Sequence, residues 1–170
     1  MKDDKQVSIN RKILFFSDVN DTAIKKLIED VMSLDNGTKE PIHIYINSYG
    51  GYVDCMQAVI DVLSLTACPI YTYITGAACS AACCIALVGE QRFITKNSQI
   101  MQHRQWGICS GYLQEAENEI KHFKAMEHTI NKWCCKRIGM KLKDFEKLIK
   151  DELWMDANQA LKLGFVHKIL

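Results

Sequence analysis

Residues 75–89 read TGAACSAACCIALVG, and this stretch decides the fold. A run typical of a β-strand, Ile70 to Ile74, precedes it, and an apolar run typical of a buried helix follows it. We therefore predict a strand, a glycine turn at Gly76, and a helix with Ser80 in or near its first turn. The N–H groups at a helix N-terminus lack helical partners, so such a turn can expose a hydroxyl and stabilise an oxyanion. Taken alone, the stretch is more typical of an Ala/Cys-rich core helix with an incidental serine.

The segments on either side alternate between strand-like and helix-like patterns. Strands are predicted at residues 13–16, 41–46, 70–74, 92–95, 99–102 and 165–170, and helices at residues 23–34, 53–65, 112–138 and 143–149, after Gly76, and after an N-cap at Asp156. The β-α-β-α-β-α order of the first half favours parallel strands with right-handed crossovers. We therefore predict one α/β domain over residues 1–170, which starts with a short flexible segment at residues 1–11.

Composition and charge narrow the class of protein. The chain has 170 residues, of which 48% are hydrophobic, so it can bury a substantial core. Its formal net charge of +1 gives no reason to expect a nucleic acid or a membrane as partner. Its start is polar, unlike a signal peptide, and no apolar run is long enough to span a bilayer. We therefore expect a cytoplasmic protein.

The eight cysteines do not follow a metal-binding pattern. None forms a C-x-x-C pair, and none stands at zinc-finger spacing with histidine. We interpret them as small apolar side chains in a reducing compartment. No metal site is predicted.

A nucleophilic serine needs a base that accepts its proton and usually an acid that orients the base. The chain offers five histidines as bases: His43, His103, His122, His128 and His167. His103 ends a predicted strand before an irregular loop, which is a favourable place for a catalytic group. Spacing alone does not select it.

Four blocks of sequence together point to a known family. They are IYINSYGG at 44–51, GAACSA at 76–81, NSQIMQH at 97–103 and WMDANQALKLGFV at 154–166. In this order and spacing they resemble the ClpP peptidases, which are self-compartmentalising serine proteases of the ClpP/crotonase fold. The resemblance extends from about residue 12 to residue 170.

The resemblance implies a role for each matching residue. Ser80 matches the nucleophile and His103 the general base, and the backbone N–H groups of Gly51 and Ala81 match the oxyanion hole. No metal or organic cofactor is implied. Residues 112–138 match the handle helix that interleaves two heptameric rings.

The resemblance also implies a substrate-binding strand just before the handle helix. The residues that match it are Gly107, Ile108, Cys109 and Gly111. An extended peptide would pair with this strand through main-chain hydrogen bonds.

The sequence departs from the family pattern near the acid of the triad. Glu152 stands where the family usually has aspartate, and Asp151 is the alternative acid. Cys79 replaces an alanine beside the nucleophile, but neighbours on a helix point about 100° apart, so it is a poor rival. The segment before the first predicted strand is shorter than the family's axial loops, so an AAA+ unfoldase is the least supported of the implied partners.

The sequence thus predicts a ClpP-type serine endopeptidase that hydrolyses peptides or unfolded proteins inside a ring of its own copies. One alternative is a non-proteolytic structural or adaptor subunit of such a ring. Another is an acyl-CoA enzyme on the related crotonase fold, against which Ser80 and His103 in family register argue.

Overall fold

The computed structural model of the protein describes residues 11–170. The flexible segment expected at residues 1–11 therefore lies outside the described residues, apart from Arg11. Arg11 is buried, and its guanidinium donates hydrogen bonds to the carbonyl oxygens of Glu40 and Pro41. These bonds attach the start of the first strand to the start of the second.

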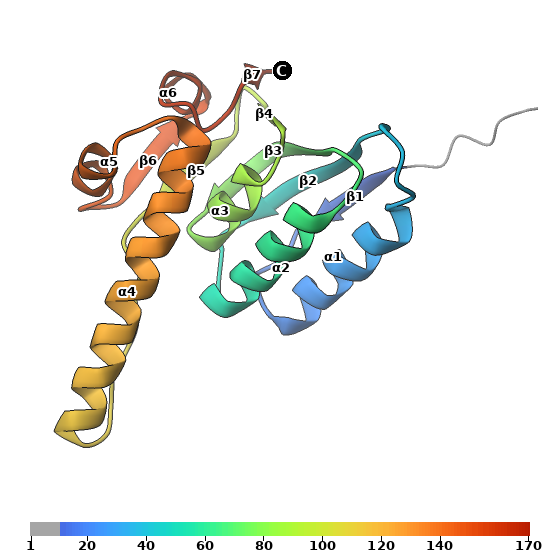
Figure 1. Ribbon diagram of the computed structural model, residues 1–170. Helices are drawn as coiled ribbons and strands as arrows, with labels where there is room; N and C mark the ends of the chain where they lie inside the picture. The colour runs from blue at the N-terminus through green and yellow to red at the C-terminus, as the bar shows by residue number, and fades with distance from the viewer. Residues whose placement is uncertain (1–10) are drawn as a thin grey trace, which may run out of the picture.

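The secondary structure follows the predicted alternation. The strands are β1 (Lys12–Phe15), β2 (Ile42–Ser48), β3 (Ile70–Cys79), β4 (Gln91–Ile94), β5 (Gln99–Gln102), β6 (Leu153–Asp156) and β7 (Lys168–Ile169). The helices are α1 (Asp21–Leu34), α2 (Val53–Leu65), α3 (Ala81–Leu87), α4 (Leu113–Ile138), α5 (Leu142–Leu148) and α6 (Ala157–Lys162). In Figure 1, α1, α2 and α3 cover one face of the sheet, and α4 projects away from the body.

The sheet forks at β3. Strands β1, β2, β3, β4 and β7 form a parallel sheet in that order, which confirms the predicted parallel pairing. The first part of β3, residues 71–74, pairs with β4, whereas its end, residues 77–79, pairs with β5. On the far side of β5, β6 adds an antiparallel strand that was not predicted from the sequence. The fork places the end of β3 directly beside the end of β5.

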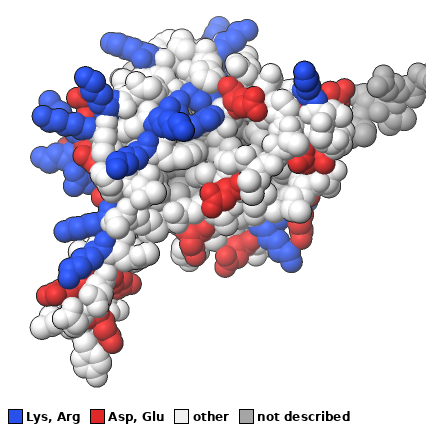
Figure 2. All heavy atoms as spheres, in the orientation of Figure 1, with Lys and Arg blue, Asp and Glu red and all other residues white. Residues whose placement is uncertain are grey.

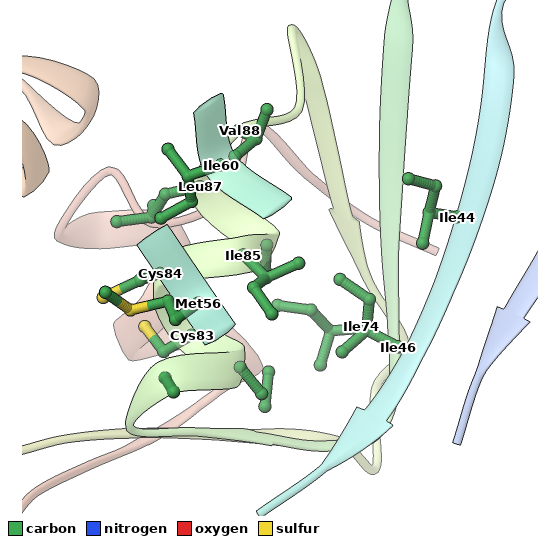
Figure 3. Close-up of a cluster of buried hydrophobic side chains, with 14 of the residues drawn as sticks. Ile44, Ile46, Met56, Ile60, Ile74, Cys83, Cys84, Ile85, Leu87 and Val88 are labelled. Carbon is green, nitrogen blue, oxygen red and sulfur yellow. The ribbon is translucent and has the colours of Figure 1, made fainter. Parts of the chain in front are cut away.

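The core lies between the sheet and helices α1 to α3, and it extends to the buried residues Cys134 of α4, Phe145 of α5 and Ala160 of α6. Alternate residues of β2, namely Ile42, Ile44 and Ile46, are fully buried on this face, as expected of a strand with period two. Figure 3 shows Ile46 and Ile74 of the sheet pointing toward Ile85 of α3. The sequence of α3 is apolar all round, and each of its residues is buried, so this helix is enclosed by the protein.

The turn before α3 differs from the predicted one. A turn is expected from the sequence at Gly76, but β3 continues through this glycine as far as Cys79. Gly76 has a φ of +107°, and a Cβ there would lie 2.5 Å from the side-chain oxygen of Asn47. The glycine therefore permits a close approach inside the strand, and the chain reverses four residues later, at Ser80.

Arg92 joins the C-terminal segment to the body of the protein. Its side chain is only 4% exposed. Its guanidinium donates hydrogen bonds to the carbonyl oxygens of Phe165, Gly164 and Arg137 at 2.9 to 3.0 Å. These carbonyl groups would otherwise be short of donors in a largely buried place.

We expect Arg92→Met to lower the free energy of unfolding by about 2 kcal/mol, because methionine fills similar space but donates no hydrogen bond. Urea denaturation followed by circular dichroism measures the change. The matched control is Lys162→Met, at an exposed position in the last turn of α6, which should change the stability by less than about 0.5 kcal/mol. Equal stability of both variants would show that the Arg92 hydrogen bonds contribute nothing net.

Candidate functional site

Ser80 occupies a strained turn between β3 and α3. Its φ of +54° and ψ of −121° make it the only non-glycine residue with positive φ within residues 11–170. Such a backbone costs roughly 1–3 kcal/mol and persists only where the surroundings enforce it. The Ser80 N–H donates to the carbonyl oxygen of Met101 at 2.8 Å, which extends the β3–β5 ladder by one bond. The side chain thus leaves the strand end at a sharp turn and faces the end of β5.

His103 follows β5 immediately and reaches the serine. Its Nε2 lies 2.8 Å from Ser80 Oγ, which is hydrogen-bond distance for a nucleophile and its base. The pairing of Cys79 with Met101 explains this proximity, because Ser80 and His103 stand one and two residues beyond that pair.

The other histidines lie elsewhere among the described residues. His43 Nδ1 contacts the hydroxyl of Tyr73 on the sheet, and His167 Nδ1 accepts from the Arg92 N–H. His122 and His128 are exposed on α4. Of the five candidate bases, only His103 is brought to Ser80.

The Gly50–Gly51 turn packs against the backbone of residues 79–81, which forms the turn at Ser80. A Cβ on Gly50 would lie 2.6 Å from the Cys79 carbonyl oxygen and 3.1 Å from the Ala81 nitrogen, so only glycine fits there. Gly51 has a φ of +150°, and a Cβ on it would collide with the backbone of Val19. Within the described part of the chain, neither the Gly51 nor the Ala81 N–H donates to another protein group. Both donors are therefore free for a ligand oxygen.

The candidate acids sit beside the site but do not contact the histidine. Glu152 Oε2 accepts a hydrogen bond from Trp154 Nε1 at 2.9 Å, and both Glu152 and Asp151 are exposed. Among residues 11–170, no side chain hydrogen-bonds to His103 Nδ1. Nevertheless, continuing the β5–β6 register from the pair Gln102–Leu153 places Glu152 opposite His103.

The same register separates the two acids. Residues opposite each other in an antiparallel pair point to the same face, and successive residues alternate between faces. Extending this alternation by one residue past the end of β6 sets Glu152 on the face of His103, whereas Asp151 lies one residue further, in a bend where the alternation no longer applies. The charge of Glu152 is also felt nearby: burial raises the pKa of the Cys79 thiol, and the Glu152 carboxylate adds to this rise.

The surroundings of Cys79 disfavour it as a nucleophile. Its side chain is fully buried, and the raised pKa keeps the thiol protonated, whereas the thiolate is the reactive form. Ser80 is partly exposed at a cleft of about 180 Å³.

The cleft has walls that were not assigned to the site from the sequence. Besides Ser80, His103 and Gly51, it is lined by Met56 of α2, Cys84 of α3, Gln102 of β5, and Ile130 and Asn131 of α4. Most of these residues repeat at helical spacing and therefore look like ordinary core positions. These residues form a cleft wall only because α2, α3 and α4 pack close to one another, which the sequence does not show.

The expected substrate-binding strand has no partner strand among the described residues. Residues 103–110 lie outside the helices and strands, and Gly107 and Ile108 are exposed. This segment runs from His103 to the start of α4. Within it, the Gln105 N–H donates to Glu127 Oε1 at 3.1 Å, and no backbone hydrogen bond ties residues 106–110 to the rest of the described chain.

The described residues contain no cluster of three or more His, Cys, Asp or Glu side chains that could hold a metal ion. None of the helices in this part of the chain is long and apolar enough to cross a membrane.

Comparison with known proteins agrees with this architecture. The sequence profile of the family described as Clp protease matches residues 2–170. ATP-dependent Clp protease proteolytic subunit 1 of Rhodopirellula baltica is 29% identical, and the match covers 92% of this chain and 68% of that protein. Proteolytic subunit 2 of Treponema denticola is 28% identical, with 94% of this chain and 81% of that protein covered.

The fold is shared with a solved structure of the same kind. A point mutant of ClpP1 from Listeria monocytogenes superimposes with a TM-score of 0.87 at 26% sequence identity, over 94% of this chain and 91% of that one. The predicted ClpP-like α/β fold is thus confirmed. The profile match over nearly the whole length shows that this chain belongs to the Clp protease family.

Proposed function

We propose that this protein is a serine endopeptidase of the ClpP type. The observation that carries the proposal is the 2.8 Å contact between Ser80 Oγ and His103 Nε2 at a strained turn. In the proposed reaction, Ser80 attacks the peptide carbonyl while His103 Nε2 takes its proton. The C–N bond then breaks, and His103 returns the proton to the leaving amine. Water hydrolyses the resulting ester by the same route in reverse.

The Gly51 and Ala81 N–H groups are proposed to bind the oxyanion of the tetrahedral intermediate. This proposal is supported by two observations: neither N–H donates to a protein group in the described part of the chain, and the Gly50–Gly51 turn packs against the backbone at Ala81. Gly51 belongs to a turn held against Val19, and Ala81 is the first residue of α3. Donors that are fixed before the reaction stabilise developing charge without reorganising.

Glu152 is proposed as the acid that orients His103. What supports it over Asp151 is the β5–β6 register, which assigns Glu152 to the face of His103. In this role Glu152 would turn from Trp154 so that a carboxylate oxygen accepts from His103 Nδ1–H. Such a bond fixes the tautomer and stabilises the imidazolium that forms during the reaction.

We expect Glu152→Gln to lower kcat by at least about a hundredfold, because an amide neither stabilises imidazolium nor selects the reactive tautomer. The matched control, Asp151→Asn, should keep kcat within about twofold, since Asp151 lies one residue further from the last β5–β6 pair than Glu152 does. Steady-state hydrolysis of a fluorogenic peptide measures both. The reverse order of effects would assign the acid to Asp151.

The proposed substrate is an extended peptide or an unfolded protein. Its backbone would pair with the segment that contains Gly107, Ile108, Cys109 and Gly111 and add a strand there. The support is the position of this segment between His103 and α4 and its free backbone. Main-chain pairing gives affinity without strict sequence selection.

The working form is proposed to be a ring of seven copies, two of which stack. The support is the projecting end of α4, where Ile108, Tyr112 and Leu113 are 73%, 81% and 86% exposed. Figure 2 shows an uncharged surface at the very end of this projection, with acidic side chains directly above it. Exposed apolar surface of this kind is typical of an interface between copies.

Two further features of the function are proposals by analogy. The relatives are named as subunits of ATP-dependent proteases, which supports an AAA+ unfoldase as the partner that would deliver unfolded protein. The eight free cysteines, seven of them buried, suit a reducing compartment such as the cytoplasm.

The second candidate is a non-proteolytic structural or adaptor subunit of such a ring. One observation favours it: the carboxylate of Glu152 is bound by Trp154 rather than by His103. A serine without an oriented base reacts slowly with a fluorophosphonate. Labelling therefore separates the two candidates.

The test is hydrolysis of a short fluorogenic peptide by the purified protein, together with fluorophosphonate labelling mapped by mass spectrometry. A peptidase should cleave the peptide and carry the label on Ser80. If light scattering shows an assembled ring that neither cleaves nor labels, the structural subunit is the correct assignment.

A further inference from the structure

Two buried cysteines from different helices meet behind the nucleophile. Cys84 of α3 and Cys134 of α4 are fifty residues apart in the sequence, but their sulfur atoms lie 3.7 Å apart. Their side chains are 2% and 0% exposed. The two sulfur atoms are in direct van der Waals contact, and a further approach of less than about 2 Å would form a disulfide.

The pair is reachable from the substrate cleft. Cys84 lines this cleft together with Ser80 and His103, although little of its surface is exposed. Figure 3 shows Cys84 beside Met56, another residue of the cleft wall. Of the two cysteines, only Cys84 lines the cleft, so a small solute that enters the cleft comes closer to Cys84 than to Cys134.

The surroundings shift the pKa values of the two thiols in opposite directions. Either thiol could donate in the contact between Cys84 and Cys134, and this hydrogen bond lowers the pKa of Cys84 and raises that of Cys134. The side-chain N–H of Gln102 also donates to the Cys84 sulfur, at 3.7 Å. The other atom of that amide, Gln102 Oε1, is buried without a partner among the described residues. Gln102 is thus turned so that its donor, not its acceptor, meets the sulfur.

We propose that Cys84 and Cys134 are an oxidisable thiol pair, in which Cys84 reacts with a hydroperoxide and Cys134 closes a disulfide. The Cys84 thiolate attacks the outer oxygen of the peroxide, the O–O bond breaks, and Cys84 becomes a sulfenic acid while water or an alcohol leaves. The Cys134 sulfur then attacks the Cys84 sulfur, the S–O bond breaks and a second water leaves. Two thiols are oxidised and one peroxide is reduced.

The disulfide would join the helix that begins after Ser80 to the projecting helix. It closes a loop of about fifty residues, so it should restrict the unfolded chain and raise Tm. The inference concerns sulfur chemistry alone and does not depend on the proposed peptidase activity. A reversible disulfide of this kind is the sort that reducing compartments tolerate.

The experiment treats the reduced, full-length protein with hydrogen peroxide and then blocks the remaining thiols with an alkylating agent under denaturing conditions. It uses a Cys109→Ser background, because Cys109 is the only one of the eight thiols that is not buried. We expect the loss of two alkylatable thiols per chain and a higher Tm, both restored by dithiothreitol. Trypsin without reduction should release the peptide 133–136 joined to the peptide that contains Cys84.

Variants identify the two sulfurs. Cys84→Ser or Cys134→Ser should prevent the cross-link, and Cys134→Ser should leave a sulfenic acid on Cys84 that dimedone traps. The matched controls are Cys83→Ala and Cys135→Ala, which change the equally buried sequence neighbours and should cross-link like the parent. An unchanged thiol count after peroxide, or a cross-link that needs Cys83 or Cys135, overturns the proposal.

Discussion

A Ser80→Ala protein should hydrolyse a fluorogenic peptide at least about a thousandfold more slowly than the wild type, and should not react with a fluorophosphonate. The reason is that alanine removes the only group that forms the covalent intermediate, while the unengaged N–H groups at the corner would still bind the carbonyl oxygen. Initial rates at several peptide concentrations, with circular dichroism to show that the fold persists, measure the effect.

The control for this variant is Cys79→Ala. Cys79 adjoins the serine, but its thiol is buried and held protonated, so its loss should leave kcat within a few-fold of the wild type. Activity that survives in Ser80→Ala but disappears in Cys79→Ala would make the thiol the nucleophile and sink the serine mechanism.

His103→Gln should lower kcat by roughly a thousandfold or more with little change in KM, because glutamine can still contact Ser80 but cannot shuttle a proton. Labelling by a fluorophosphonate should slow in parallel, since it needs the same activated hydroxyl. Single-turnover labelling rates separate this loss from any change in peptide binding.

His128→Gln provides the comparison for that variant. His128 is exposed on α4, lies 4.0 Å from Glu146 and is not among the residues that line the cleft at Ser80. Its replacement should leave kcat unchanged within about twofold. Equal losses in both variants would indicate that the histidines act through assembly or folding rather than through proton transfer.

Local patterns in the sequence predict most of the elements. The apolar spacing of residues 53–65 gives α2 with the bounds that the structure has, and α6 has the expected capping box of Asp156 and Gln159. Such features depend on neighbours within about one helical turn, which a sequence displays directly. The long helix is likewise expected at residues 112–138 and is found at Leu113–Ile138.

Features that depend on distant partners are not predictable in this way. The strand β6 is only four residues long and exists because β5 offers it a partner, so its own residues carry little signal. The turn is predicted at Gly76, four residues before its position at Ser80, because a glycine in the sequence suggests a chain reversal. In the structure Gly76 is instead required by the close approach of the Asn47 side chain on the neighbouring strand β2. The contact of Cys84 with Cys134 depends on the packing of α3 against α4, and the spacing of residues in the sequence does not predict that packing.

The fork of the sheet at β3 has a mechanical consequence. Ser80 and His103, the proposed nucleophile and base, follow directly on the paired ends of β3 and β5, so the backbone ladder between these strands sets their separation. Glu152, the proposed acid, directly precedes β6, and among the described strands β6 pairs with β5 alone. A displacement of β6 would therefore move Glu152 away from His103, while Ser80 and His103 would keep their spacing.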